Sequence, residues 1–329
     1  MRPGPRNLIT DVPGLLVGQA TDERAASGVT VLHVDRAWPA AVDVRGGGPG
    51  TRETETLAPE NLIGRAHAVV LAGGSVFGLA AADGVAAALS ARRIGLTLKP
   101  GSPAIPIVPA AVLHDLGNGG DKSWGLDPPY RALGMQALAA ASADFSLGSV
   151  GAGRGAMAGL IKGGVGSASI DLGEGLVVGA LIALNSVGSA LMPDGKTYWA
   201  WPFELDGEFG GAQPPAAPLR IVDPAPDESR LNALGRLQPG ANTTLGAVAC
   251  SAALTNAECK RVAMMAQDGI ARGVRPAHTP FDGDTLFALA GGAIELQLQS
   301  QRAAQVGRIG SAAADCVARA IARAVFHSR

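Results

Sequence analysis

Asn242 and Thr243 are the neighbouring residues whose types could do the most chemistry, and they stand just before an apolar run, Leu245–Ala253. A threonine hydroxyl is a weak nucleophile. If the chain is cut before Thr243, however, the freed α-amine lies beside that hydroxyl and can act as its base. The reference pKa of an α-amine, about 7.7–8.0, is already close to neutral pH. The same hydroxyl could make the cut by attacking the Asn242 carbonyl. An ordinary turn leading into a strand is the alternative interpretation.

A second group of chemical interest is the pair Asp282 and Asp284, which flank Gly283. If this run is extended, a spacing of two residues points both carboxylates to the same side. Two like charges held together favour one shared proton, and the pair could anchor the Thr243 ammonium and relay a proton to it. The alternative is an Asp-Gly turn with solvated carboxylates.

The elements that must position these residues can be predicted from apolar patterns. Runs rich in β-branched residues and bounded by Gly, Pro or Asn predict buried strands at Val29–Val34, Ala68–Ala72, Ile94–Leu98 and Leu176–Leu184. Ala and Leu at helical spacing predict core-facing helices at Ser75–Arg92 and Tyr130–Ala143. Ser75 could cap the first of these helices by accepting its free amide hydrogens.

The stretch Gly210–Gly240 is polar, charged and interrupted by prolines, so it can sustain neither a helix nor a central strand. We expect an exposed connector at about 210–240 that delivers Thr243 to the first residue of a core strand. The elements predicted after it are a strand at Leu245–Ala253, a helix at about Asn256–Arg272, a strand at Thr285–Ala290 and a helix at about Ser311–Phe326.

Composition excludes several classes of function. Of 329 residues, 47% are hydrophobic and 17% charged, and the net charge is −1, so we expect a large core and no nucleic-acid partner. Three widely spaced cysteines favour reduced thiols and a cytoplasmic protein, and no signal peptide or membrane span is predicted. Scattered histidines without HExxH or CxxC predict no metal, and the glycine loops lack GxxxxGK[ST], so we expect no cofactor.

Several segments occur in one order along the chain and together carry a family resemblance: Arg45–Thr54, Leu71–Leu79, Pro109–Leu113, Gly240–Leu245 and Phe281–Phe287. They resemble the D-aminopeptidase/β-peptidyl aminopeptidase family of self-processing hydrolases over roughly residues 8 to 326. The threonine and the Asp-Gly-Asp sequence look most like the nylon-oligomer (6-aminohexanoate-oligomer) hydrolases. The serine-nucleophile aminopeptidases of the family carry a different residue at the first of the two aspartate positions.

This resemblance implies a four-layer αββα sandwich of the type found in N-terminal-nucleophile hydrolases. It also implies that one domain, residues 1–329, is cut by itself into a large fragment, 1–242, and a small fragment, 243–329. The two fragments would stay together as a heterodimer, and heterodimers would assemble into a homo-oligomer, a tetramer.

The resemblance also implies roles for individual residues. Thr243 matches the nucleophile, and Asn242 matches the residue whose carbonyl is attacked. Asn185 matches an asparagine that donates to the oxyanion, a contribution worth about 3–4 kcal/mol in a dry site. Lys162 matches a lysine beside the nucleophile, where its charge could lower the pKa of the Thr243 amine or orient the hydroxyl. The residue types alone also allow a structural interpretation. Asn185 could form a local hydrogen bond in a turn, and the Lys162 side chain could extend to the surface.

One position departs from the family pattern. His114 falls where the nylon-oligomer hydrolases have a tyrosine near the nucleophile. An imidazole could replace the hydroxyl as a donor or proton shuttle, but a histidine after an apolar run is often structural. The role of residue 114 in the pocket therefore stays open.

We therefore predict a self-processing N-terminal-threonine amidohydrolase that cleaves short peptides or linear oligoamides through an acyl-enzyme. One alternative is an acyltransferase of the ornithine acetyltransferase type, which also cuts itself before a threonine but passes the acyl group to an amine. Another is a non-catalytic assembly protein that retains the fold.

Overall fold

The computed structural model describes residues 1–216, 223–225, 227, 229–231, 242–297 and 300–329. A single hydrogen-bonded path joins most of its strands, in the order β3-β5-β4-β2-β11-β10-β9-β8, and β1 also pairs with β2. The strands of this sheet are β1 (Leu15–Asp22), β2 (Ser27–Val44), β3 (Thr51–Arg52), β4 (Arg65–Ala72), β5 (Ala110–Val112), β8 (Gly164–Asp171), β9 (Val177–Asn185), β10 (Thr243–Ala252) and β11 (Thr285–Ile294). A separate short hairpin joins β6 (Met157–Ala158) and β7 (Ile161–Lys162).

The long strand β2 takes part in both layers of the sheet. Its first part pairs with β1 and β4, and its last residues, Ala40–Val44, pair with β11. The pairing of β2 with β4 shifts register between His33 and Trp38, where the two layers diverge. The sheet therefore curls over on itself through β2, with β1, β3, β4 and β5 in one layer and β8–β11 in the other.

Apolar side chains fill the space between the two layers. Val17, Leu32 and Leu71 face into it from one layer, and Leu245 and Phe287 face into it from the other, all of them buried. Removing each such side chain from water contributes about 1.5–3 kcal/mol, so this interface is a large part of what holds the layers together.

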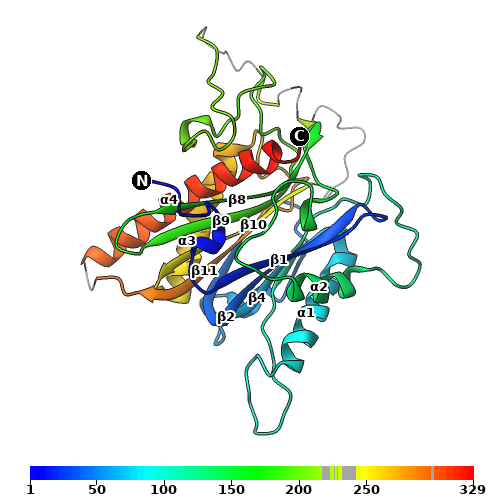
Figure 1. The fold of residues 1–329 in the computed structure, drawn as a ribbon, viewed down its shortest axis with the longest axis vertical. Helices are drawn as coiled ribbons and strands as arrows, with labels where there is room; N and C mark the ends of the chain where they lie inside the picture. Colours follow the sequence, from blue (N-terminus) through cyan, green and yellow to red (C-terminus); the bar gives the residue numbers. More distant parts are fainter. Residues whose placement is uncertain (217–222, 226, 228, 232–241, 298–299) are drawn as a thin grey trace.

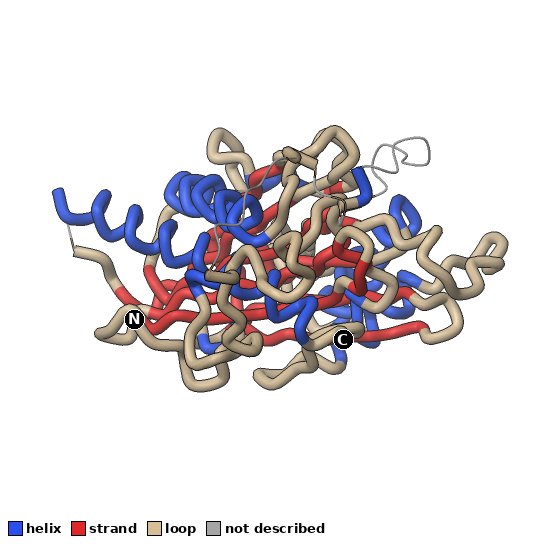
Figure 2. The backbone as a smooth tube through the Cα atoms, turned by 90° about the horizontal axis from the view of Figure 1, so that it is seen from above, coloured by secondary structure: helices blue, strands red, loops and turns tan. Residues whose placement is uncertain are grey.

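Helices cover the outer face of each layer. Helices α3 (Asn256–Gly273) and α4 (Ser300–Phe326) pack together over β8–β11, while α1 (Ala80–Ala91) and α2 (Tyr130–Ala139) pack over β1, β2 and β4. Figure 1 shows these helix pairs on opposite sides of the strands, and Figure 2 shows the strands in the middle of the molecule. The predicted αββα order of layers is confirmed.

Of the predicted strands, Val29–Val34, Ala68–Ala72 and Leu176–Leu184 lie in β2, β4 and β9. The strand predicted at Ile94–Leu98 is wrong. Only Leu96 makes a single bridge, to Ile105 across a loop, and Leu98 is 79% exposed. The local pattern is strand-like, but no sheet edge lies beside this segment to pair with it.

The helix predicted from Ser75 begins later than expected. Residues Ser75–Leu79 form the 3₁₀ helix η3, and the α-helix α1 starts at Ala80. The predicted cap is also wrong, because Gly74 is the cap residue of η3 and the Ser75 side chain makes no capping bond. Gly74 and Ser75 have φ of 80° and 51°, so the chain enters η3 through a left-handed turn, which is not the extended cap conformation.

The other helix predictions differ only at their ends. Helix α2 stops at Ala139 instead of Ala143, because Ser142 exchanges two backbone hydrogen bonds with Val17 of β1. The last helix begins at Ser300, earlier than the predicted Ser311. Helix α3 matches its prediction closely and is fixed by a capping box between Thr255 and Glu258.

The predicted connector at about 210–240 lies partly outside the described residues, namely at 217–222, 226, 228 and 232–240. Within its described part, Gly210, Gly211 and Pro215 are exposed, whereas Ser229 is buried. The three cysteines, Cys250, Cys259 and Cys316, are free thiols in the core. In the described part of the chain, no helix combines the length and apolar character needed to cross a membrane.

Candidate active site

Thr243 is the first residue of β10 and is buried, with 1% of its surface exposed. Its direct partner across the antiparallel pair β9–β10 is Asn185, the last residue of β9. Residues directly opposite each other in such a pair project to the same face of the sheet. The fold therefore brings together two predicted site residues that are far apart in the sequence.

The peptide bond between Asn242 and Thr243 is intact in this structure, and its carbonyl oxygen receives two donors. The Thr243 hydroxyl donates to the Asn242 oxygen, and the Gly283 backbone N–H donates to the same oxygen at 2.9 Å. A carbonyl that accepts two hydrogen bonds is polarised toward attack, and negative charge developing on its oxygen is stabilised. The hydroxyl predicted to attack thus lies against the bond that it would cut.

Asn185 is held by hydrogen bonds at both ends of its amide. Its Oδ1 accepts from Met157 N–H at 3.0 Å and from the Asn118 side chain at 3.2 Å. Its Nδ2 donates to the carbonyl oxygen of His114 at 3.0 Å. An amide nitrogen carries two N–H donors, and the bond to His114 uses one of them.

His114 reaches the site through its main chain, by accepting this bond from Asn185. Its half-buried imidazole follows β5 in the loop that also carries Asn118. The sequence placed residue 114 beside the site, but the contact that the structure provides is one that any residue type could make.

Lys162, in β7, donates from Nζ to the backbone oxygen of Arg154 at 3.0 Å. Burial lowers the pKa of Lys162, the Arg154 charge lowers it further, and the Asp115 charge opposes both effects. Burial and a neighbouring like charge both disfavour the ammonium form of a lysine. Its hydrogen bond is to Arg154 and not to Thr243.

The carboxylates of Asp282 and Asp284 are both 1% exposed and precede β11. Asp282 accepts from Val187 N–H at 3.1 Å and from the Thr279 hydroxyl at 2.6 Å. Asp284 accepts from the backbone N–H of Thr244 at 2.7 Å. In the intact chain Asp284 therefore bonds to the peptide group that follows Thr243, and the backbone of Asp282 forms a bridge with that of Asn242.

The charge of Asp284 acts on the neighbouring carboxyl group of Asp282. Burial, followed by the Asp284 charge, raises the pKa of Asp282 to about 6. His278 donates to Asp284 from Nδ1 at 2.8 Å. Burial lowers the pKa of His278, but this bond and the Asp284 charge outweigh burial, so the pKa is raised overall. A carboxyl group that titrates near pH 6 can take up and release a proton under mild conditions.

Sequence reasoning missed several contributors to this region. The Gly283 N–H and the Asn118 side chain are two of them, and the buried Asp115 is a third. Asp115 accepts from Gly74 N–H at 2.7 Å, and burial raises its pKa. Asp115 follows His114 directly, but nothing in the local sequence marks it as buried. Among the residues that the structure describes, no group of three or more His, Cys, Asp or Glu residues is placed to hold a metal ion.

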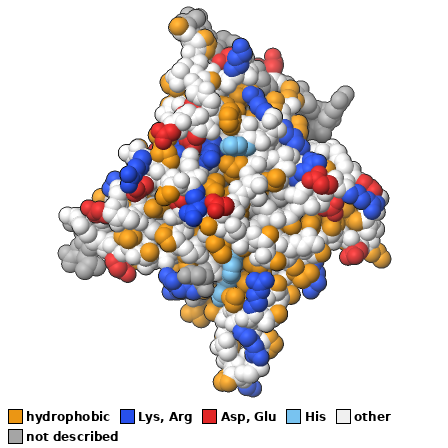
Figure 3. Space-filling model, in the orientation of Figure 1, with side chains coloured by type: hydrophobic (Ala, Val, Ile, Leu, Met, Phe, Trp, Pro, Cys, Tyr) orange, Lys and Arg blue, Asp and Glu red, His pale blue; other side chains and the backbone are white. Residues whose placement is uncertain are grey.

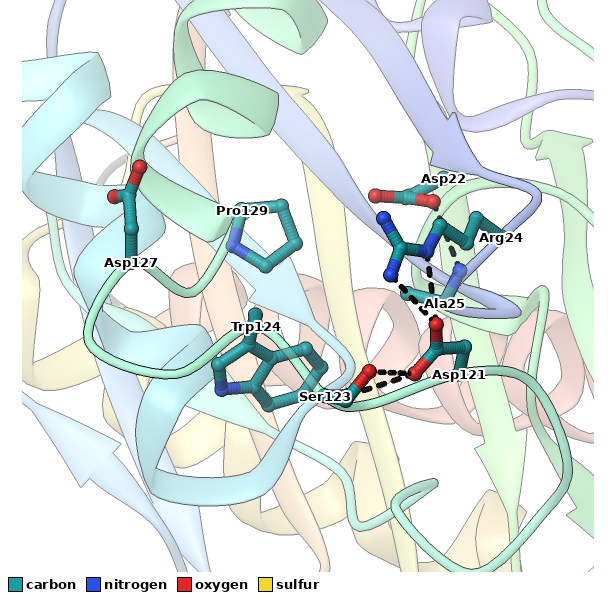
Figure 4. Close-up of a pocket in the computed structure, with 8 residues that line it drawn as sticks. All are labelled: Asp22, Arg24, Ala25, Asp121, Ser123, Trp124, Asp127 and Pro129. Carbon is teal, nitrogen blue, oxygen red and sulfur yellow. Dashed lines mark hydrogen bonds and ion pairs between the residues drawn. The ribbon is translucent and has the colours of Figure 1, made fainter.

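The loop that carries Asn118 continues into a pocket of about 370 Å³, shown in Figure 4. Arg24 and Asp121 are ion-paired on one side of it at 2.6 Å. Asp22, Trp124 and Asp127 also line it, which gives it more negative than positive charge. None of the predicted site residues lines this pocket.

On the face shown in Figure 3, charges of both signs are interspersed, without a large patch of one sign.

Comparisons with known proteins identify the family of this chain. Residues 7–329 match the model of peptidase family S58. An uncharacterized aminopeptidase of Mycobacterium tuberculosis (strain ATCC 25618 / H37Rv) is 44% identical over 98% of this chain and 94% of its own length. A 6-aminohexanoate-oligomer endohydrolase of Kocuria sp. (strain KY2) is 30% identical over 89% of this chain and 77% of its own length.

Among solved structures, the L-aminopeptidase D-Ala-esterase/amidase of Ochrobactrum anthropi superposes with a TM-score of 0.67. The two chains are 20% identical, and the match covers 99% of this chain and 88% of the other. That protein is described as a variant of the Ntn-hydrolase fold, so the predicted fold type is confirmed.

Proposed function

The chain belongs to peptidase family S58 and is a hydrolase of amide bonds, and we propose that it matures by cutting itself between Asn242 and Thr243 and then works through the freed Thr243. The observation that carries the proposal is the shared oxygen of Asn242. Both the Thr243 hydroxyl and the Gly283 N–H donate to it, within a buried site.

The cut is an N-to-O acyl shift followed by hydrolysis. The Thr243 Oγ1 forms a bond to the Asn242 carbonyl carbon, the bond from that carbon to the Thr243 nitrogen breaks, and the hydroxyl proton ends on that nitrogen. The Gly283 N–H stabilises the transient oxyanion. Water then opens the ester, which gives a carboxyl group on Asn242 and restores the hydroxyl of Thr243.

Turnover repeats the same chemistry on a substrate amide. The Thr243 α-amine takes the hydroxyl proton as Oγ1 attacks, and it returns the proton to the leaving amine. The acyl-enzyme is then hydrolysed by water. Asn185, opposite Thr243 across the strand pair, supplies an N–H to the oxyanion, and Lys162 contributes positive charge near the amine.

The carboxylates are assigned to the new α-amine. Asp284 already holds the neighbouring Thr244 N–H, and the backbone of Asp282 forms a bridge with that of Asn242, on the other side of Thr243. After the cut, a negative charge this close stabilises the ammonium form and orients the amine. Asp282, with its raised pKa, is placed to exchange a proton with it.

For substrates, we favour short peptides and linear oligoamides that are largely uncharged along their length. The relatives reported above are named as an aminopeptidase and as a hydrolase of 6-aminohexanoate oligomers. The two fragments stay associated because β10 and β11, which follow the cut, are paired with β9 and β2, which precede it. We further propose a tetrameric assembly and a cytoplasmic location, the latter supported by three free, buried thiols.

The test is an assay of amide hydrolysis by purified wild type and by the Thr243→Ala variant. The substrates are 6-aminohexanoate oligomers and peptide amides with a free N-terminus. The proposal expects hydrolysis by wild type alone. A parallel assay with acetylornithine and glutamate separates hydrolysis from acyl transfer. Acetyl transfer without amide hydrolysis would replace the proposal with the acyltransferase alternative, and hydrolysis by Thr243→Ala would remove the threonine from the mechanism.

A further inference from the structure

Arg230 contacts Asn242, the residue that supplies the carbonyl group of the bond proposed to be cut. Its Nη1 donates to the side-chain Oδ1 of Asn242 at 2.6 Å. The bond is between a charged donor and a neutral acceptor, and it lies in a part of the molecule where Asn242 is fully buried. Hydrogen bonds that involve a charged group are about twice as strong as neutral ones.

Arg230 is itself fixed to the framework of the site. Its backbone N–H donates to the carbonyl oxygen of Val187 at 2.8 Å, and its Nε donates to the carbonyl oxygen of Gly159 at 2.7 Å. Val187 in turn donates its N–H to Asp282. The backbone of Arg230 is therefore anchored to the segment that follows Asn185, and its guanidinium to the turn that precedes Lys162.

The position of this guanidinium is unfavourable by itself. Burial lowers the pKa of Arg230, and the Asp282 charge opposes this effect. Within the described ranges, Arg230 makes no ion pair with a carboxylate. Partial burial of a cation costs free energy unless hydrogen bonds replace those lost to water, and the bonds to Gly159 and Asn242 do so.

These contacts immobilise Asn242 from two directions. Its main chain is held by Gly283, which donates to its oxygen, and by Phe281, whose oxygen accepts from its N–H at 3.3 Å. Its side chain is held by Arg230. Holding both fixes the rotation of the carbonyl group with respect to the Thr243 hydroxyl, and an error of about 1 Å in such an alignment can cost about 100-fold in rate.

We propose that Arg230 is a positioning residue for self-cleavage, which acts by holding the Asn242 side chain so that the carbonyl group stays aligned with the Thr243 hydroxyl and the Gly283 N–H. This inference rests on the proposed self-cleavage and adds a requirement to it. It gives a function to a residue of the segment 210–240, for which the sequence predicted only an exposed connector.

The experiment is a double-mutant cycle on the rate of cutting. Wild type, Arg230→Ala, Asn242→Ala and the double variant are synthesised in a short cell-free pulse and quenched in denaturant at intervals, and the intact chain is resolved from its fragments by mass. Both single variants are expected to cut about 10- to 100-fold more slowly, the range for loss of a charge-assisted hydrogen bond. The double variant is expected to be no slower than the slower single variant.

Two further variants separate positioning from a general effect on the fold. Arg230→Met retains much of the side-chain volume and is expected to be as slow as Arg230→Ala. Arg308→Ala removes another arginine bonded to a backbone oxygen, that of Leu172, and is expected to cut at the wild-type rate. Millimolar guanidinium ion, well below denaturing concentrations, is expected to speed Arg230→Ala at least several-fold and to leave Asn242→Ala unchanged.

The outcomes distinguish failure of the Arg230 inference from failure of the proposed self-cleavage. Cutting of Arg230→Ala and Arg230→Met at the wild-type rate overturns the inference and leaves the proposed function standing. A double variant slowed by the product of the two single effects also overturns it, because the two residues then act independently. A wild type that stays intact, like Thr243→Ala, removes the self-cleavage and this inference together.

Discussion

Gly283 offers the sharpest structural perturbation of the proposed cut. Its N–H donates to the Asn242 oxygen, and a methyl group added at its Cα would lie 2.8 Å from the Thr243 Oγ1 and 2.8 Å from the carbonyl oxygen of Gly48. Ordinary van der Waals contact begins near 3.4 Å. Because Gly283 has no positive φ, alanine fits its backbone conformation, and the effect of Gly283→Ala comes from this contact.

The expected size of the effect follows from the distances. The new methyl group forces the Thr243 hydroxyl away by roughly half an ångström or more, and displacements of about 1 Å at a reacting centre cost about 100-fold. We expect Gly283→Ala to cut itself about 10- to 100-fold more slowly than wild type while its N–H remains in place. The assay is the same pulse synthesis, quenched at intervals and analysed by intact mass.

A matched control is Gly307→Ala in helix α4, where an added methyl group meets nothing within 4 Å. Its cutting rate should equal that of wild type. Circular dichroism melting of both variants shows whether the fold is retained. If Gly283→Ala cuts as fast as wild type, the hydroxyl of Thr243 does not act from the position that the structure gives it, and the reasoning is refuted.

Two other predictions concern stability. Glu208→Ala leaves the fully buried Arg319 without its carboxylate partner, so the free energy of unfolding in urea should fall by about 3–5 kcal/mol. The control variant Glu60→Ala, at an exposed residue, should change this free energy little. A loss below about 1 kcal/mol in Glu208→Ala would contradict the prediction. Asp282, whose pKa is raised from 3.8 to about 6, stays protonated in the folded protein over a range where the unfolded chain ionises. The contribution of Asp282 to the free energy of unfolding is therefore largest below about pH 4 and is lost as the pH rises through about 6. Midpoints of urea unfolding should show this trend in wild type, and the trend should be absent in Asp282→Asn.

The sequence predicted those parts of the fold that depend on local patterns. The apolar runs in β2, β4, β9 and β10 are continuous and bounded by turn residues, so their positions could be identified. The segment Ile94–Leu98 has the same pattern but no partner strand, and pairing is a long-range property that composition does not encode.

The site was predictable to the extent that it depends on residue types. Thr243, Asn185 and the aspartate pair were named from chemistry and from the family resemblance, and the structure places Asn185 opposite Thr243 and the two aspartates against the residues on either side of it. Arg230 was not identified, because its significance lies in a hydrogen bond to Asn242 that leaves no local sequence pattern. The role of the Gly283 N–H was also not predicted, because every non-proline residue carries such a donor.

The most direct test of the account is the state of the Asn242–Thr243 bond in purified, active protein. Intact-mass analysis combined with N-terminal sequencing should find a fragment that begins Thr-Thr-Leu-Gly in wild type. The Thr243→Ala variant should give only one chain of 33.0 kDa. Active wild type that remains a single chain of that mass, or a Thr243→Ala variant cut at the same bond, would contradict the central claim.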